Sequence, residues 1–209
     1  MPLEGGAVTV HGAGRTDAGV HAMGQVASVQ LACAHDAPTL GRALNAQLPP
    51  DVRVLGVEEA PADFHARFSA RFKHYRYQME RAPIADPFRR AWTWHVPDAL
   101  DVDAMAEAAQ LLVGTHDFAA FQSAGTSVTE TVRTITRSAV TSGDVLVYDV
   151  EGTGFLRHMV RAIVGTLVEV GRGRRRPASM ASLLEKRTRA DAGRTAPAQG
   201  LFLVRVDYD

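Results

Sequence analysis

The chain has 209 residues, of which 46% are hydrophobic and 22% charged; these values are typical of a globular protein and exclude fibrous and disordered classes. Its 23 basic and 23 acidic residues give no net charge, and this balance argues mildly against a nucleic-acid-binding domain, which is usually basic. The length allows one large domain or two small ones with a substantial core.

The number of cysteines and the hydropathy of the chain indicate the cellular compartment of the protein. Cys33 is the only cysteine, so no disulfide forms within the chain, and this fits a reducing cytoplasm. The first residues show no basic region followed by an apolar stretch, and no run of about eighteen apolar residues occurs. We therefore expect a cytoplasmic protein without a membrane span.

The N-terminal third is expected to fold as strand, loop, strand, helix and strand. Apolar residues alternate over residues 7–10 and 25–31, which is typical of half-buried strands. A helix is predicted at residues 39–48, because Pro49 and Pro50 end it. Residues 52–57 are predicted to form the next strand.

The rest of the chain contains further strands and helices. Strands are predicted at residues 72–79, 92–96, 131–140, 145–151 and 201–206. Helices are predicted at residues 101–113, 155–170 and 178–187, with a long polar loop at 115–129. Because strands and helices do not alternate with the regular rhythm of a parallel sheet, we expect an α+β fold with antiparallel sheets.

The stretch His11–Ala22 joins the first two predicted strands and holds three glycines, two histidines, Arg15 and Asp17. Glycines permit backbone angles that other residues resist, and loops on a rigid sheet often carry functional groups. No Gly-Lys-Ser/Thr follows, so a nucleotide P-loop is rejected, and no Cys or His pair at metal-binding spacing supports a metal site. On residue types alone, a structural turn, a catalytic carboxylate and an anion or metal site all stay open.

Two segments are basic within this neutral chain. Between Arg157 and Arg189 there are nine Lys or Arg residues and two acids, and the segment from Arg67 to Arg76 contains four basic residues and no acid. Each segment fits either a surface that gathers a phosphate backbone or a solvated charged face. A further Arg, Asp and Gly cluster at residues 189–195 lacks the Arg-Thr-Asp order of the first loop, and we expect it to be a surface loop.

The stretch GRTDAGVHA, Gly14–Ala22, resembles the active-site motif of the tRNA pseudouridine synthase I family. The similarity continues in family order over nearly the whole chain, which makes it far more specific than one short motif. The matching blocks are Gly14–Ala22, Ala43–Pro49, Phe64–Ala70, Tyr75–Tyr77, Gly114–Phe118, Phe155–Arg161 and Gly200–Val204.

The resemblance implies a fold of two similar halves, each with an antiparallel sheet flanked by helices, around a central catalytic cleft. We expect an N-terminal half at residues 1–64 that carries the catalytic loop, and a C-terminal half at residues 65–209. The implied activity is isomerisation of uridine to pseudouridine in the anticodon stem-loop of tRNA, at positions 38, 39 and/or 40. The resemblance also implies a homodimer, and the reaction requires no cofactor and no metal.

The resemblance also assigns roles to individual residues. Asp17 is expected to act at the ribose carbon during the exchange of bonds, and Arg161 is expected to pair with it, because a guanidinium favours an ionised carboxylate. Tyr75, Arg15 and Leu201 are expected to bind the substrate: Tyr75 lines the uracil pocket, Arg15 touches the RNA backbone and Leu201 forms an apolar wall. The residues expected to bind RNA are Arg67, Lys73, Arg76, Arg157, His158, Arg174, Arg175 and Arg176.

The chain departs from the family at its start, because it lacks the strand and helix that precede the catalytic loop in the family. We expect either a start codon that is assigned too late or the loss of part of the first domain. A missing strand would expose an unpaired sheet edge. The alternative to an active enzyme is therefore a non-catalytic RNA-binding protein or an inactive fragment.

Overall fold

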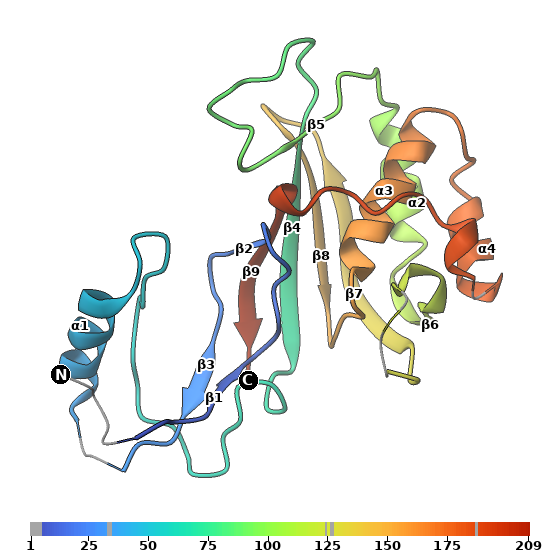
Figure 1. Cartoon of the computed structure of the whole chain (residues 1–209). Coiled ribbons are helices and arrows are strands. Elements are labelled where there is room, and N and C mark those ends of the chain that lie inside the picture. Colours follow the sequence, from blue (N-terminus) through green and yellow to red (C-terminus); the bar gives the residue numbers. More distant parts are fainter. Residues whose placement is uncertain (1–5, 33–34, 124, 126–127, 187) are drawn as a thin grey trace. The chain divides into compact units, whose positions relative to one another are not determined.

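The computed structural model describes residues 6–32, 35–123, 125, 128–186 and 188–209 (Figure 1). These residues divide into two compact units. The larger unit comprises Arg15–Gln25 and Ala70–Asp209, and the smaller unit comprises the chain up to Gly14 together with Val26–Ser69. Cys33 and the expected helix end at Arg187 lie outside the described residues, as does part of the expected loop at 115–129. The expected halves, residues 1–64 and 65–209, remain a prediction.

The larger unit is built on a seven-stranded sheet. Its strands are β2 (His21–Ala22), β4 (Phe72–Glu80), β5 (Trp94–His95), β6 (Gly114–Asp117), β7 (Val132–Thr141), β8 (Leu146–Gly152) and β9 (Leu201–Asp207). They lie in the order β2-β9-β4-β8-β7-β6, with β5 also paired to β4.

The α+β fold is confirmed, with one difference in the sheet. All long neighbours are antiparallel, as expected, but β2 pairs with β9 in parallel and β5 pairs with β4 in parallel. Each parallel pair is only two residues long and joins segments separated by a long connection, which parallel pairing requires. The β2 pairing matters for function, because it fastens the end of the glycine-rich loop to the central sheet.

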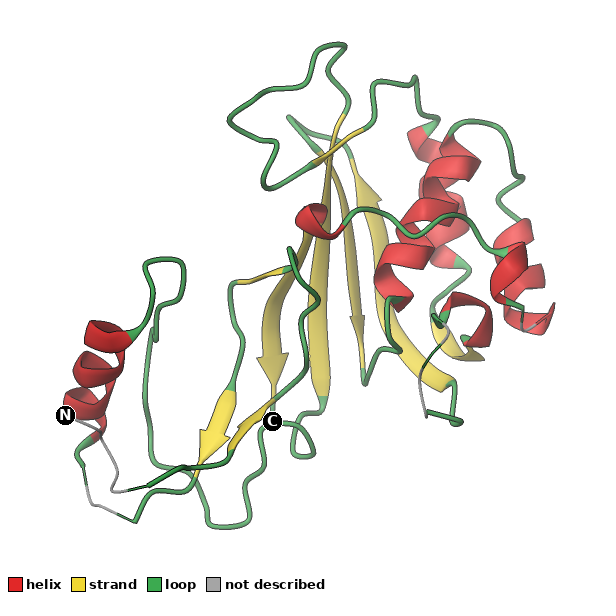
Figure 2. Cartoon of the chain, viewed as in Figure 1, coloured by secondary structure: helices red, strands yellow, loops and turns green. Residues whose placement is uncertain are grey.

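Three helices of the larger unit lie together on one face of this sheet (Figures 1 and 2). They are α2 (Val102–Gln110), α3 (Met159–Gly171) and α4 (Ser179–Lys186). Helix α2 begins at the N-cap Asp101, whose carboxylate accepts from Ala104 N at 2.9 Å, and it buries Met105 and Ala109 as its apolar spacing predicts. Helix α3 is buried around almost its whole circumference, so it forms the centre of the core.

Helix α3 begins four residues later than expected. Residues 155–158 form the turn before it, because His158, its N-cap, has a φ of 61°. Among the described residues, His158 is the one non-glycine residue with a positive φ. Strained backbone of this kind is often found at functional sites.

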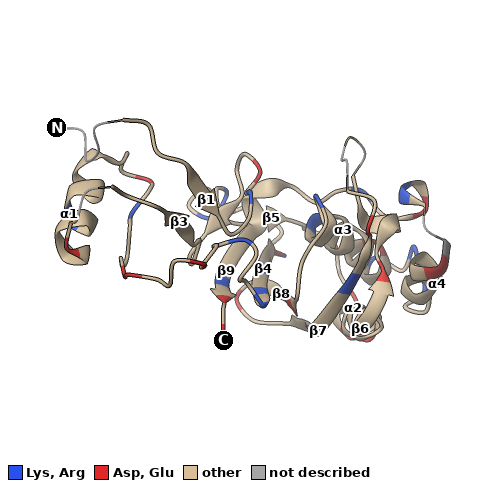
Figure 3. Cartoon of the chain, turned by 90° about the horizontal axis from the view of Figure 1, so that it is seen from below, with Lys and Arg blue, Asp and Glu red and all other residues tan. Residues whose placement is uncertain are grey.

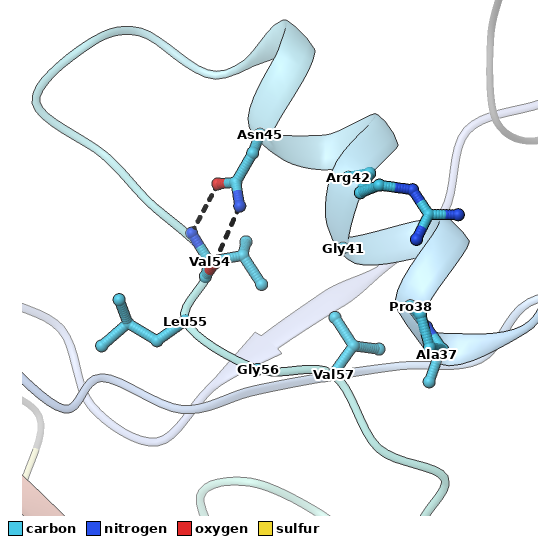
Figure 4. Close-up of a pocket in the computed structure, with 9 residues that line it drawn as sticks. All are labelled: Ala37, Pro38, Gly41, Arg42, Asn45, Val54, Leu55, Gly56 and Val57. Carbon is cyan, nitrogen blue, oxygen red and sulfur yellow. Dashed lines mark hydrogen bonds between the residues drawn. The ribbon is translucent and has the colours of Figure 1, made fainter.

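The smaller unit contains a two-stranded antiparallel sheet, β1 (Val10–Gly12) with β3 (Ala27–Val29), and the helix α1 (Ala37–Gln47). The predicted strand at residues 52–57 is wrong. The backbone of Val54 forms two hydrogen bonds of 2.8 Å with the side-chain amide of Asn45 on α1, and these replace a strand ladder (Figure 4). A pocket lies between α1 and residues 54–57, and Leu55 beside it is 88% exposed.

The segment at residues 189–195, which was predicted to be a surface loop, is partly buried in the structure. Ala192 and Gly193 are buried against α3, and the backbone of this segment approaches the backbone of the helix closely. A Cβ added at Gly165 would lie 1.6 Å from the Arg194 carbonyl oxygen. The two glycines at 165 and 193 therefore allow two backbones to meet where side chains would hold them apart.

Candidate active site

Asp17 lies in a tight turn of the larger unit, just before β2. The amide of Val20 donates to the Asp17 carbonyl at 3.0 Å, and Gly19 completes the turn with a φ of 81°. Beyond the turn, His21 and Ala22 pair with Phe202 and Leu203 of β9. This parallel pairing fixes the carboxylate at the edge of the sheet, and Gly19 is required because its left-handed backbone is costly for other residues.

The Asp17 carboxylate has two basic partners, and both approach the same oxygen. Arg161, on the first turn of α3, donates from Nη1 to Oδ2 at 3.0 Å. His158 places Nε2 3.2 Å from Oδ2. Both contacts are made to Oδ2, so the carboxylate is held through one of its two oxygens.

Neighbouring groups restrict the side chains of Arg161 and His158, the two partners of Asp17. The Arg161 side chain is only 15% exposed, whereas the Asp17 side chain is 37% exposed. Ser123 Oγ lies 2.7 Å from His158 Nδ1. If the serine hydroxyl donates to Nδ1, the proton of the neutral ring is on Nε2 and points at Asp17. The two contacts therefore hold the Asp17 carboxylate in one orientation.

Tyr75 lies in the same unit, on β4 opposite Leu203 of β9. Its ring meets the Phe155 ring edge-on, with centroids 5.0 Å apart. Burial raises the pKa of Tyr75 to about 12, and the negative charge of Asp17 adds to the effect. The phenol therefore stays protonated at neutral pH and keeps a proton that it can donate. Leu201, at the start of β9, is buried opposite Tyr77.

The other predicted site residues differ in exposure and in the unit to which they belong. Arg15 and Arg157 are exposed, and Arg157 donates to the Gly125 carbonyl at 3.3 Å. Lys73 is half-buried on β4. Arg67 belongs to the smaller unit, where its guanidinium lies over the Phe68 ring. Their contacts with RNA remain predictions.

The three arginines that follow α3, at residues 174–176, differ in their contacts. Arg174 and Arg176 are exposed, whereas Arg175 is half-buried and pairs with Glu169 on α3. A guanidinium already paired with a carboxylate has less to gain from a phosphate. The three arginines, which sequence reasoning treated alike, are therefore not equivalent.

Arg76, another residue expected to bind RNA, is part of an ion-pair cluster within the sheet. Its guanidinium donates to both oxygens of Asp149 on β8, at 3.0 and 3.2 Å, and His74 Nε2 lies 2.7 Å from Asp149 Oδ1. Burial alone would raise the pKa of Asp149, but the hydrogen bonds from Arg76 and His74 outweigh burial and lower the pKa. Asp149 is thus a buried, ionised anchor for two basic side chains.

We expect Asp149→Asn to lower the free energy of unfolding by about 2 kcal/mol at neutral pH, because the buried His74 and the partly exposed Arg76 both lose their charged partner. Because the folded pKa lies below 3.8, this stabilisation is complete above that pH and is lost as pH falls through the folded pKa. Urea unfolding of both proteins at several pH values measures the difference. If the difference in unfolding free energy between wild type and Asp149→Asn stayed constant or grew below pH 3.8, the prediction would be contradicted. The matched control is Asp144→Asn, at an exposed position.

Sequence reasoning missed the contact between His158 and Asp17, because it assigned His158 to RNA binding alone. The three-residue spacing of His158 and Arg161 was the available signal, since residues three apart lie on the same side of a helix. It also missed the role of His21, whose ring stacks on Phe202 with centroids 4.9 Å apart and lies 4.8 Å from Trp92. His21 Nε2 also donates to the Ala91 carbonyl at 2.8 Å, so this histidine anchors the loop at 81–93 beside β2.

Comparison with known proteins gives the family. A family model described as tRNA pseudouridine synthase matches residues 3–69 and 108–209. The tRNA pseudouridine synthase A of Geobacillus kaustophilus is 50% identical over 208 residues, which are 99% of this chain and 80% of that protein. Those of Halalkalibacterium halodurans and Shouchella clausii are 47% and 48% identical over 95% and 98% of this chain, and over 76% and 79% of their own lengths.

The α+β sheet with helices on one face and a carboxylate held against a guanidinium is an arrangement consistent with the pseudouridine synthase fold. The chain belongs to the tRNA pseudouridine synthase family, which is a family of isomerases. Within the described ranges, no helix has both the length and the apolar character needed to cross a membrane. In the same part of the chain, no three His, Cys, Asp or Glu side chains gather in a way that could hold a metal ion.

Proposed function

We propose that this protein isomerises uridine to pseudouridine in the anticodon stem-loop of tRNA, at positions 38, 39 and/or 40. The observation that carries the proposal is the Asp17 carboxylate, held through Oδ2 by Arg161 and His158. The names of the relatives support tRNA as the substrate, and the resemblance of the GRTDAGVHA loop supports the anticodon stem-loop.

The reaction exchanges one bond of the nucleoside for another. The bond between the ribose C1′ and the base N1 breaks, the base turns, and a bond between C1′ and the base C5 forms. C5 loses its proton and N1 gains one, so the product is an isomer and no outside oxidant or reductant is consumed. Asp17 Oδ1 is the group that acts on the sugar while the base is detached.

The neighbours of Asp17 divide the remaining tasks. Arg161 and His158 hold the carboxylate fixed in direction, so that little reorganisation is needed during the reaction. Tyr75 offers an aromatic face and a protonated hydroxyl to the extruded uracil, and Leu201 supplies an apolar surface. Extruding the base costs a few kcal/mol, and stacking returns about 1–3 kcal/mol. Arg15 contacts the RNA backbone beside the flipped nucleotide.

Exposed basic residues bind the phosphates of the tRNA. Figure 3 shows Lys and Arg positions spread over several elements of the larger unit, including β7 and α3, so the phosphate contacts are distributed. The homodimer implied by the family resemblance and the cytoplasmic location expected from the sequence belong to the same proposal. Light scattering of the purified protein with and without tRNA tests the dimer.

The release of the hydrogen from C5 tests the activity. We expect a tRNA transcript labelled with tritium at uridine C5 to lose label when it is incubated with the protein alone. Replacing the uridines at positions 38, 39 and 40 with cytidine should abolish the release. Tight tRNA binding without release would overturn the proposal and favour a non-catalytic RNA-binding protein.

Removing Arg174 and Arg176 together is expected to reduce the salt dependence of tRNA binding. Each lost phosphate contact lowers the slope of log K against log salt by about 0.7–0.9, so the double Ala variant should lose about one to two. Arg175→Ala is the matched comparison: because Arg175 pairs with Glu169, its slope should change less. Equal slopes in wild type and the double variant would contradict a phosphate-binding role for this run.

A further inference from the structure

The segment at residues 189–200 lies between α4 and β9 in the chain and contacts both Arg161 and the turn that carries Asp17. In Figure 1 it is the red segment that leaves α4, passes over α3 and ends at the short helical turn beside β9. The segment contains two 3-10 turns, Arg189–Asp191 and Ala198–Gly200. We call it the brace.

The brace holds Arg161 at two points. Arg161 Nε donates to the Ala196 carbonyl at 2.8 Å, and the Ala196 amide donates to the Arg161 carbonyl at 3.0 Å. One residue of the brace thus fixes both the main chain and the side chain of Arg161. With Nε held in this way, the planar guanidinium presents Nη1 to Asp17.

Two residues further along, the brace meets the loop that carries Asp17. A Cβ at Gly19 would lie 3.4 Å from the Ala198 Cβ, which is an ordinary contact distance. Just before this point, the Pro197 carbonyl accepts from the hydroxyl of the buried Tyr77 at 2.7 Å. The brace therefore lies between the turn of Asp17 and the first turn of α3, and is itself anchored to the sheet.

The far end of the brace is held by Arg189, which touches neither Asp17 nor Arg161. Arg189 Nη1 donates to the Gly193 carbonyl at 2.9 Å and Nη2 donates to Thr195 Oγ1 at 2.8 Å. The Gly193 amide donates to Thr166 Oγ1 on α3 at 2.9 Å. These bonds set the path of the backbone immediately before Ala196.

We infer that Arg189 is a positioning residue of the isomerase, which acts through the brace to aim Arg161 at Asp17. Thr166 is the corresponding anchor on α3. The inference rests on the proposed function for its kinetic consequences, but the geometry of Arg161 is defined without them. The Arg, Asp and Gly cluster at residues 189–195 thus serves the site from a distance.

The first test is a double-mutant cycle on single-turnover isomerisation at saturating protein. We expect Arg189→Gln to lower the rate by about tenfold or more, because small displacements of catalytic groups are costly, while tRNA affinity stays within about twofold. In the Arg161→Met background the same change should lower the rate by less than about twofold, because the group it positions is gone. Glu185→Gln, an exposed residue of α4 just outside the brace, is the matched control and should leave the rate unchanged.

The second test is independent of catalysis. The Arg161 Nε–H signal, identified by its absence in Arg161→Met, is observed by nuclear magnetic resonance of protein labelled with ¹⁵N. Because Nε–H donates to Ala196, its proton should exchange slowly in wild type and at least about tenfold faster in Arg189→Gln and in Thr166→Val.

Equal rate losses for Arg189→Gln in both backgrounds would overturn the inference, as would unchanged proton exchange in both Arg189→Gln and Thr166→Val. Failure of the proposed function gives a different result, since wild type would then release no label from tRNA. In that case the exchange measurement alone decides whether the brace holds Arg161.

Discussion

Replacing Asp17 with Asn is expected to abolish isomerisation and to leave tRNA binding nearly unchanged. The amide has the same shape and its oxygen still accepts from Arg161, so the turn and its pairing with β9 should persist. An amide cannot act as the charged group at the ribose carbon. The single-turnover rate should therefore fall by about a thousandfold or more, as is typical when a nucleophile is removed.

The measurement is tritium release from C5-labelled tRNA, together with the dissociation constant at two salt concentrations. Affinity should stay within about threefold, because one loop carboxylate makes no phosphate contact. Asp144→Asn, in the exposed hairpin between β7 and β8, is the matched control and should behave as wild type. Turnover of Asp17→Asn near the wild-type rate would remove Asp17 from the chemistry.

The elements that sequence could predict are those whose pattern is local. The apolar spacing around Met105 and Ala109, with an Asp at the N-cap, specifies α2 wherever it is placed in the chain. The long strands β4, β7, β8 and β9 were likewise visible from alternation. The pairing of Asp17 with Arg161 came from resemblance, because a contact between residues so far apart in the chain leaves no mark in either local stretch.

The elements that sequence could not predict depend on partners elsewhere in the fold. Residues 52–57 alternate like a strand, but the Asn45 side chain takes the backbone bonds of Val54 that a neighbouring strand would need. The start of α3 is displaced by the positive φ of His158, which no propensity favours in a non-glycine residue. Arg76 and Arg175 are basic residues in basic segments, yet each is paired with a carboxylate that only the fold brings near.

The brace illustrates the same limit in a functional segment. Gly193 is required because its backbone lies against Thr166, and Gly165 because its backbone lies against Arg194. In the sequence these two glycines are an ordinary turn residue and an unfavourable helix residue. The need for both glycines becomes visible only in the fold, where the brace packs against α3 close to Arg161.

Arg161→Met should separate a catalytic partner of Asp17 from a simple phosphate contact. Methionine keeps much of the apolar stem in a site that is mostly buried, so packing around this side chain should change little, but the bonds to Asp17 and Ala196 are lost. We expect the single-turnover rate at saturating protein to fall by about a hundredfold, comparable to the loss of one fixed donor to a charged group. Arg161→Lys should recover only part of the rate, because an ammonium cannot bridge Asp17 and the Ala196 carbonyl as a planar fork does.

The salt dependence of tRNA binding distinguishes a phosphate contact of Arg161 from a catalytic role. If Arg161 instead bound a phosphate, Arg161→Met would weaken tRNA affinity, the weakening would fade as salt rises, and the saturating rate would be restored once all tRNA is bound. Arg157→Met, from an exposed position one turn earlier, provides that pattern for comparison. A low rate that persists at saturation in Arg161→Met, with a salt slope equal to that of wild type, requires Arg161 to act on the carboxylate and not on the RNA backbone.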